Sequence, residues 1–157
     1  MFKGKKKALI SILSVFIAFV FVQSLFFKFS NAPETQHIFG VLDLWAAEKF
    51  GFKGLFVAPG IFNAYVVGTI ELISSILLMV GISTSRKILI PVGAFVALSV
   101  ITGAISFHLF TPLGVNVQGD GGTLFIMACG VWLSSVILLM LHRDIVIKCI
   151  KGNKPSS

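Results

Sequence analysis

Glu71 is the one charged residue in an apolar run, residues 62–82, that is long enough to cross a membrane. A charge at bilayer depth costs at least ~2.5 kcal/mol on insertion scales, so such a residue usually faces the inside of a bundle and indicates a functional site. Spacings of three or four residues place polar side chains on one helix face with it. This stripe, predicted to face the bundle interior, comprises Asn63, Val67, Glu71, Ser74 or Ser75, and Leu78.

Depth along the membrane decides which polar residues of other runs could meet Glu71. At a rise of ~1.5 Å per residue, Glu71 lies near the midplane, Gln23 about 8 Å above it and His108 about 14 Å above it. A direct bond between Glu71 and His108 is therefore not expected. The expected first partners are Gln23, Ser74, Ser99 or Thr102, with a water chain reaching outward to Lys28 and His108. The candidate ligand-binding residues are Glu71, Gln23, Lys28, His108, Asn63 and Ser74.

Three roles are open for Glu71. It can fasten two helices as a hydrogen-bonded acid, line a cavity for a small hydrophobic ligand such as a quinone or a lipid, or belong to a proton or ion path. If no partner lies close, desolvation favours the neutral acid. His108 is expected to be a histidine with its hydrogen bonds satisfied near a helix end.

The chain shows no pattern for a tightly held cofactor. The spans contain no histidine pair for haem, and there is no cysteine cluster and no nucleotide-binding motif. The outer residues Glu34, His37, His108 and Asp120 lack metal-ligand spacing, so no metal site is predicted. Cys129 and Cys149 differ too much in depth for an easy disulfide. A quinone is the one cofactor that stays open.

The composition indicates the elements that would position these residues. The 157 residues are 56% hydrophobic and only 12% charged, which is far below the charge of a soluble domain. Residues 8–27, 62–82, 88–110 and 123–141 form four apolar runs near the ~20 residues that span a bilayer as a helix. An all-α integral membrane four-helix bundle is predicted, as one domain over residues 1–150 with a disordered polar tail over 151–157. The first run exceeds the core of a signal peptide, so it is predicted to be an uncleaved helix.

The net charge of +7 is a topology signal. With both termini inside, ten lysines and arginines lie on the cytoplasmic side and three, Lys28, Lys49 and Lys53, on the outer side. Such a bias favours cytoplasmic termini. Because the basic residues are spread over several loops, no nucleic-acid partner is predicted.

The long segment between the first two runs is predicted to hold a short outer amphipathic helix over about residues 32–50. Asn31 is the expected N-cap, Glu34 the residue that returns a capping bond, and Gly51 the stop. Asp43, Glu48 and Lys49 are expected to form its wet side.

Two further patterns concern the third and fourth runs. Gly93 with Ala97, and Ser99 with Gly103, have the small-residue spacing that lets helices approach closely. The glycine-rich outer loop over residues 111–122 is not a phosphate loop, and its Asp120 is expected to start the fourth helix or to form a turn with the glycines.

Four stretches together resemble the DoxX-like family of small bacterial membrane proteins: FFKFSNAPETQHIF, GTIELISSILLMVG, GAISFHLFTPLGVNVQGDGG and LLMLHR. The resemblance implies a four-helix bundle in the bacterial inner membrane, with recurring polar positions at Lys28, Glu71 and His108. The family is named after a membrane subunit of a thiosulfate:quinone oxidoreductase. The resemblance thus implies an accessory or small-hydrophobic-ligand-binding subunit of a redox or envelope process, with the bilayer and a soluble or membrane oxidoreductase as partners.

Two alternatives remain beside the accessory subunit. One is a quinone-linked oxidoreductase membrane subunit, which would need its cofactor from a partner. The other is a proton-coupled transporter, which typically has several intramembrane charges and an inverted repeat; neither is found in this sequence.

Overall fold

The computed structural model describes residues 2–84, 86 and 88–151, and over these residues every regular element is a helix. The six helices are α1 (Phe2–Phe29), α2 (Pro33–Phe50), α3 (Ala64–Ser83), α4 (Leu89–Phe110), α5 (Thr123–Leu141) and α6 (Arg143–Ile150). The predicted all-α class is confirmed. Of the predicted tail, residues 152–157 lie outside the described part of the chain.

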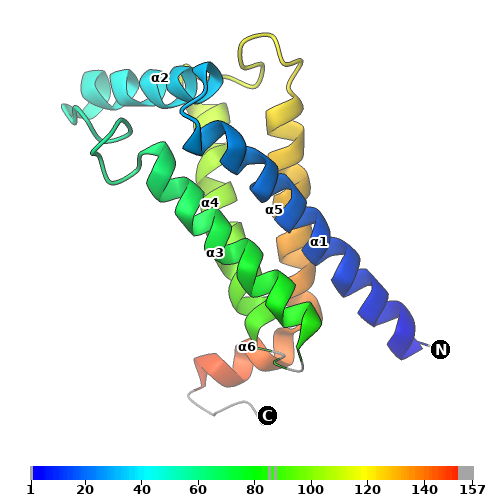
Figure 1. The fold of residues 1–157 in the computed structure, drawn as a ribbon. Helices are drawn as coiled ribbons and strands as arrows, with labels where there is room; N and C mark the ends of the chain where they lie inside the picture. The colour runs from blue at the N-terminus through cyan, green and yellow to red at the C-terminus, as the bar shows by residue number, and fades with distance from the viewer. Residues whose placement is uncertain (1, 85, 87, 152–157) are drawn as a thin grey trace.

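Four of the helices are long and apolar enough to cross a membrane: α1 from Gly4, α3, α4 and α5. They lie side by side, with α1 running alongside α3 and crossing diagonally over α5, and α4 packed between α3 and α5 (Figure 1). The four-helix membrane bundle is therefore confirmed, and α5 has the predicted bounds. α1 is longer than predicted because lysine is a good helix former, so the helix continues through the basic flank.

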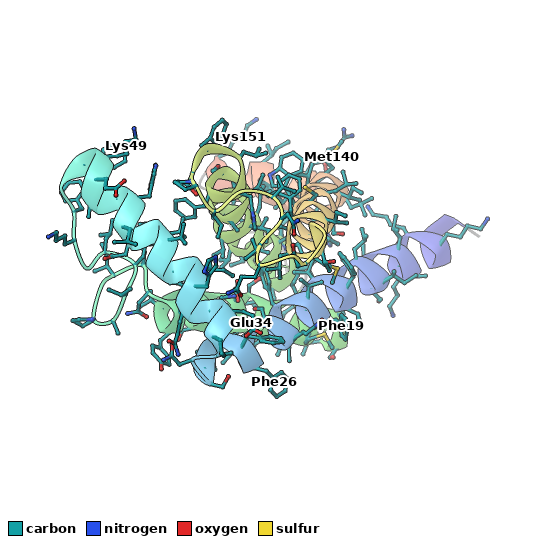
Figure 2. The ribbon with its side chains drawn as sticks, turned by 90° about the horizontal axis from the view of Figure 1, so that it is seen from above. Phe19, Phe26, Glu34, Lys49, Met140 and Lys151 are labelled. Carbon is teal, nitrogen blue, oxygen red and sulfur yellow. The ribbon has the colours of Figure 1, made fainter. Side chains whose placement is uncertain are left out.

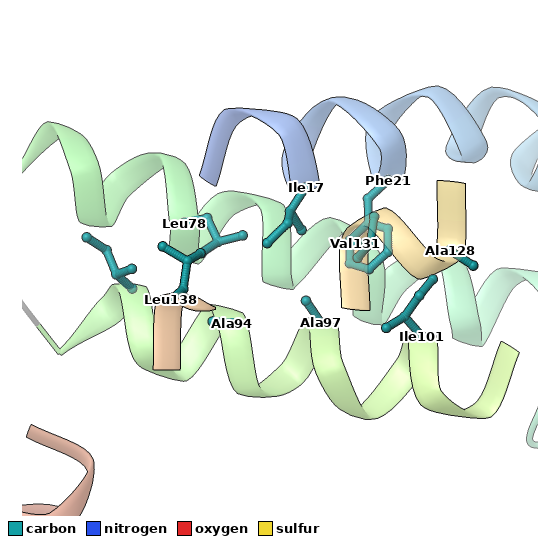
Figure 3. Close-up of a cluster of buried hydrophobic side chains, with 10 residues drawn as sticks. Ile17, Phe21, Leu78, Ala94, Ala97, Ile101, Ala128, Val131 and Leu138 are labelled. Carbon is teal, nitrogen blue, oxygen red and sulfur yellow. The ribbon is translucent and has the colours of Figure 1, made fainter. Parts of the chain in front are cut away.

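The core of the bundle lies where these four helices meet (Figure 3). It is formed by fully buried side chains that include Ile17, Phe21, Leu78, Ala97, Val131 and Leu138. Lipid-facing side chains lie on the opposite faces; Phe19 and Phe26 of α1 are 62% and 73% exposed and point away from the bundle (Figure 2). Apolar residues on both sides of each helix are what a bilayer environment requires.

One of the two small-residue pairs forms a close helix contact. A Cβ placed on Gly93 would lie 3.0 Å from Leu78 Cγ, and the Ser74 hydroxyl donates to the Gly93 carbonyl at 2.9 Å. The prediction for Gly93 and Ala97 is confirmed, whereas that for Ser99 and Gly103 is wrong. A Cβ placed on Gly103 would meet no atom of another helix within 4 Å, and Ser99 is exposed with its hydroxyl bonded to its own helix.

α2 lies across one end of the bundle, the end that is predicted to be the outer one (Figures 1 and 2). Its buried residues Leu42 and Ala46 form a second hydrophobic cluster with Phe56, Leu113 and Val117 of the two outer loops. The Trp45 ring meets Phe107 of α4 edge to face at 6.5 Å. The outer helix thus caps the bundle through loops that are far apart in the sequence.

The start of α2 differs from its prediction. Asn31 has a φ of 51°, and the Asn31 and Ala32 N–H groups donate back to Lys28 and Phe27 carbonyls at 3.3 and 3.0 Å. This is the hydrogen-bond pattern of a Schellman motif, so Asn31 ends α1 because asparagine tolerates the left-handed conformation. α2 begins after Ala32 without a side-chain cap, so the expected bonds of Asn31 and Glu34 are wrong. Gly51 ends α2 with a φ of 76°, as predicted.

Asp43 does not belong to the wet side of α2, although Glu48 and Lys49 are exposed as expected. Its carboxylate accepts the N–H groups of Phe56 at 2.9 Å and of Gly54 at 3.1 Å. The bond from Phe56 and the weaker one from Gly54 lower the pKa of Asp43 below its usual value. Asp43 therefore fastens the loop after α2 onto the helix.

Asp120 organises the other outer loop, as predicted. Its carboxylate accepts from the N–H groups of Leu124, Gly122 and Val117, each at 2.9 Å. These bonds, with the one from Leu124 as the largest cause, lower the pKa of Asp120. The side chain both caps the first turn of α5 and closes the turn before it.

The short helix α6 follows α5 directly at His142 and was not predicted. It has only eight residues, and three of them, Arg143, Asp144 and Lys148, are charged, so its pattern does not stand out from a polar flank. α6 and the first turns of α1 lie at the same end of the bundle, opposite α2 (Figure 1).

Candidate functional site

Lys28 and Glu71 form an ion pair between α1 and α3. The Lys28 ammonium lies 2.8 Å from Glu71 Oε2 and 3.1 Å from Oε1. The Ser24 hydroxyl lies 2.7 Å from the same Oε2 and accepts from Lys28 Nζ at 3.0 Å. Its single proton can be donated to Glu71 or to the Phe21 carbonyl at 2.8 Å. The three side chains form a closed hydrogen-bonded triangle.

The direction of the two helices brings these side chains together. α1 runs toward the outer end of the bundle and α3 runs away from it (Figure 1). Side chains of a helix lean toward its N-terminus, so Lys28 reaches back toward the membrane centre and Glu71 reaches outward. Ser24 precedes Lys28 by four residues and shares its face.

Gly68 lets α1 come close at this level. A Cβ on Gly68 would lie 3.0 Å from Phe29 Cε1, 3.3 Å from Leu25 Cδ2 and 3.4 Å from Lys28 Cδ. The absent side chain therefore leaves room for the aliphatic stem of Lys28. Gly68 lies one turn before Glu71 on the same face of α3. This spacing is visible in the sequence, but Gly68 was not predicted as a site residue.

The pair is largely shielded from the surroundings: the side chains of Lys28 and Glu71 are 15% and 7% exposed. At such sites charges interact strongly but also lose much solvation. Glu71 has the Lys28 ammonium and the Ser24 hydroxyl beside it. A neutral acid is expected only if no partner lies close to Glu71, and that condition is not met.

The expected first partners of Glu71 are also wrong. Gln23 is exposed on the outside of α1, because a step of 100° per residue turns it away from the face of Ser24. The hydroxyls of Ser74, Ser99 and Thr102 bond to backbone carbonyls instead. Backbone depth does not include the four-carbon stem of Lys28, which reaches Glu71 without a water chain.

His108 lies apart from this pair, and the prediction of no direct bond to Glu71 agrees with its position. Its Nδ1 lies 2.6 Å from the Gly114 carbonyl, which can only accept, so Nδ1 carries the proton. The ring is buried and meets Phe125 edge to face at 5.7 Å. His108 holds the loop after α4 against the start of α5, as expected of a satisfied histidine near a helix end.

Asn63 and Ser74 also have structural partners. Asn63 is the N-cap of α3: it accepts from the Tyr65 and Val66 N–H groups and donates to the Gly60 carbonyl at 2.6 Å. Ser74 bonds to Gly93 of α4. Both are buried, as is the rest of the predicted stripe apart from the half-buried Val67. The stripe faces the interior, but of the six candidates only Lys28 and Glu71 come together.

Among the described residues, no group of three or more histidine, cysteine or acidic side chains is arranged to hold a metal ion. Cys129 is a free thiol on the exposed side of α5.

Comparison of the chain with protein-family models, with curated proteins and with solved structures gives no match in any of the three. The geometry of Lys28, Glu71 and Ser24 is therefore the basis for a functional proposal.

Proposed function

We propose that this protein is an accessory subunit of a bacterial inner-membrane redox or envelope process, with cytoplasmic termini and no chemistry of its own. The supporting observation is that the Glu71 carboxylate has its hydrogen bonds from Lys28 and Ser24 of the same chain. A carboxylate engaged in this way fastens helices and is not free to act as an acid or base. The resemblance to DoxX-like proteins supports the choice of process.

A second candidate is the binding of a small hydrophobic ligand with a carbonyl oxygen, such as a quinone. It is favoured by the unequal exposure of the pair, because 15% of the Lys28 side chain stays accessible against 7% for Glu71. An ammonium group has three donors, and one could turn to a ligand oxygen at this edge while Glu71 keeps the other contacts.

Purification of the full chain in mild detergent, followed by solvent extraction and absorption spectroscopy, separates the two. The accessory role without a ligand predicts a colourless sample and no quinone in the extract. A stoichiometric quinone that is lost in Lys28→Gln but kept in the matched control Lys5→Gln, an exposed lysine of the same helix, would favour the ligand-binding subunit. Haem or flavin absorption in the pure chain would overturn the proposal that it lacks chemistry of its own.

A further inference from the structure

A cavity lies between the first turns of α1, the end of α3, the start of α4 and the junction of α5 with α6. These segments lie at the opposite end of the bundle from α2 (Figure 1). Its volume is about 580 Å³, within the range of ~300–1,000 Å³ typical of ligand sites. It is open to the surroundings at the level where all four candidate spans begin or end. A molecule in it would therefore lie at the height of lipid headgroups.

The lining of this cavity has a charged part and an apolar part. Lys6 and Lys7 supply two positive charges, and Asp144 supplies one negative charge. Asp144 lies 3.9 Å from Arg143, with both side chains mostly exposed, so that contact is weak. The apolar part includes Ile10, Ile82 and Leu141.

Three other polar residues of the lining, Ser83, Thr84 and His142, have hydrogen bonds to backbone carbonyls. The Ser83 and Thr84 hydroxyls donate to carbonyls of α3 at 2.8 Å. The Nδ1 atom of His142 lies 2.8 Å from the Leu138 carbonyl and donates to it. The two lysine ammonium groups are thus the charged donors available to an anion, and the Ser11 hydroxyl also belongs to the lining.

We propose that this cavity binds the headgroup of an anionic phospholipid, with its phosphate between Lys6 and Lys7 and its acyl chains along the isoleucines. Basic pockets between membrane helices on the cytoplasmic side suit anionic lipid headgroups. The apolar half of the lining favours a lipid over a free anion, and the depth of the cavity favours a lipid over a soluble acidic partner. The site is separate from the Lys28 and Glu71 pair and does not depend on its role.

Native mass spectrometry of the full chain, with phosphatidylglycerol and phosphatidylcholine added in equal amounts, tests this site. The protein is expected to retain phosphatidylglycerol preferentially. Each lysine near an anionic surface contributes about fivefold in affinity, which corresponds to ~1 kcal/mol. Lys6→Gln with Lys7→Gln should therefore weaken phosphatidylglycerol binding by about 25-fold, and Asp144→Asn should strengthen it.

The matched control replaces Lys5 and Lys148, which are exposed near the same end but do not line the cavity. Lys5→Gln with Lys148→Gln removes the same charge and should leave the preference nearly unchanged. Equal losses in the two double variants would overturn the site, because only the general positive charge would then matter. Displacement of the lipid by inorganic phosphate at equal concentration would overturn the lipid and indicate an anion site instead.

Discussion

At the scale of residues, the meaning of Glu71 depends on Lys28. Two opposite charges that are mostly buried gain Coulomb energy but lose hydration, so the pair as a whole contributes little while each member depends strongly on the other. Loss of one partner leaves the other charge mostly buried and without a counter-charge. The Lys28 ammonium can regain solvation without its partner, because Lys28 lies at the end of α1 and its long side chain can turn toward the interface. Glu71, farther along α3, has no such route.

A double-mutant cycle on the pair should show this asymmetry. Lys28→Met is expected to lower the free energy of unfolding by about 3 kcal/mol, because it leaves the Glu71 carboxylate unpaired. Glu71→Leu is expected to lower it by less, because the Lys28 ammonium can turn toward the interface. Glu71→Gln keeps hydrogen bonds to Ser24 and should cost less. Combining Lys28→Met with Glu71→Leu should recover most of the loss. The measurement is reversible unfolding in detergent, followed by circular dichroism.

The control for this cycle is Lys5→Met combined with Glu71→Leu. Lys5 lies on the same helix as Lys28, but it is exposed and lies near the other end of that helix. No recovery of stability is therefore expected. Additive losses in the Lys28 and Glu71 cycle would contradict a direct coupling between these two side chains.

At the scale of elements, the contact of α1 with α3 depends on Gly68. The Phe29 ring and the Leu25 side chain occupy the space next to it. A side chain there would push α1 away from α3 at the level of the ion pair. Gly103 of α4, in contrast, faces open space. The two glycines therefore have different structural roles.

Substitution of these two glycines should therefore have opposite effects. Gly68→Leu is expected to destabilise the bundle by about 1–3 kcal/mol through overpacking. Gly103→Ala is expected to stabilise it by about 0.5–1 kcal/mol, because alanine is the better helix former and nothing lies in its way. Thermal unfolding in the same detergent measures both. A stable Gly68→Leu protein with an intact Lys28 and Glu71 coupling would contradict the close approach of α1 and α3.

At the scale of the whole molecule, the outer end is built differently from the membrane part. The four spans pack against one another, whereas α2 is held by a separate cluster of loop residues that includes Phe56, Leu113 and Val117. Asp43 and Asp120 fix those loops by accepting backbone N–H groups. The two layers share Phe107 of α4 as a contact.

Placing a cysteine at Asn116 tests the orientation of this layer. In a background with Cys129 and Cys149 replaced by alanine, Asn116→Cys should react with a membrane-impermeant thiol reagent in intact cells, because the loop over residues 111–122 is predicted to lie outside. A cysteine at Lys148 of α6 should react only after the cells are opened. The reverse pattern would contradict cytoplasmic termini.

Much of the fold could be predicted because the signals are local. Four apolar runs of the right length specify four spans, Gly51 ends α2 through its left-handed conformation, and Asp120 closes a turn with its own neighbours. The failures at the element ends are local as well: Asn31 suits both the end of one helix and the start of the next, and the sequence contains nothing that chooses between them.

The interior position of Glu71 follows from the sequence alone, because helical periodicity places it on one face with Asn63, Ser74 and Ser75. Only the tertiary structure decided its partner. Lys28 is 43 residues away in the chain, and the rotation of α1, the room left by Gly68 and the length of the lysine stem together select Lys28 and Ser24 over Gln23. These are relations between helices, and periodicity within one helix carries no information about them.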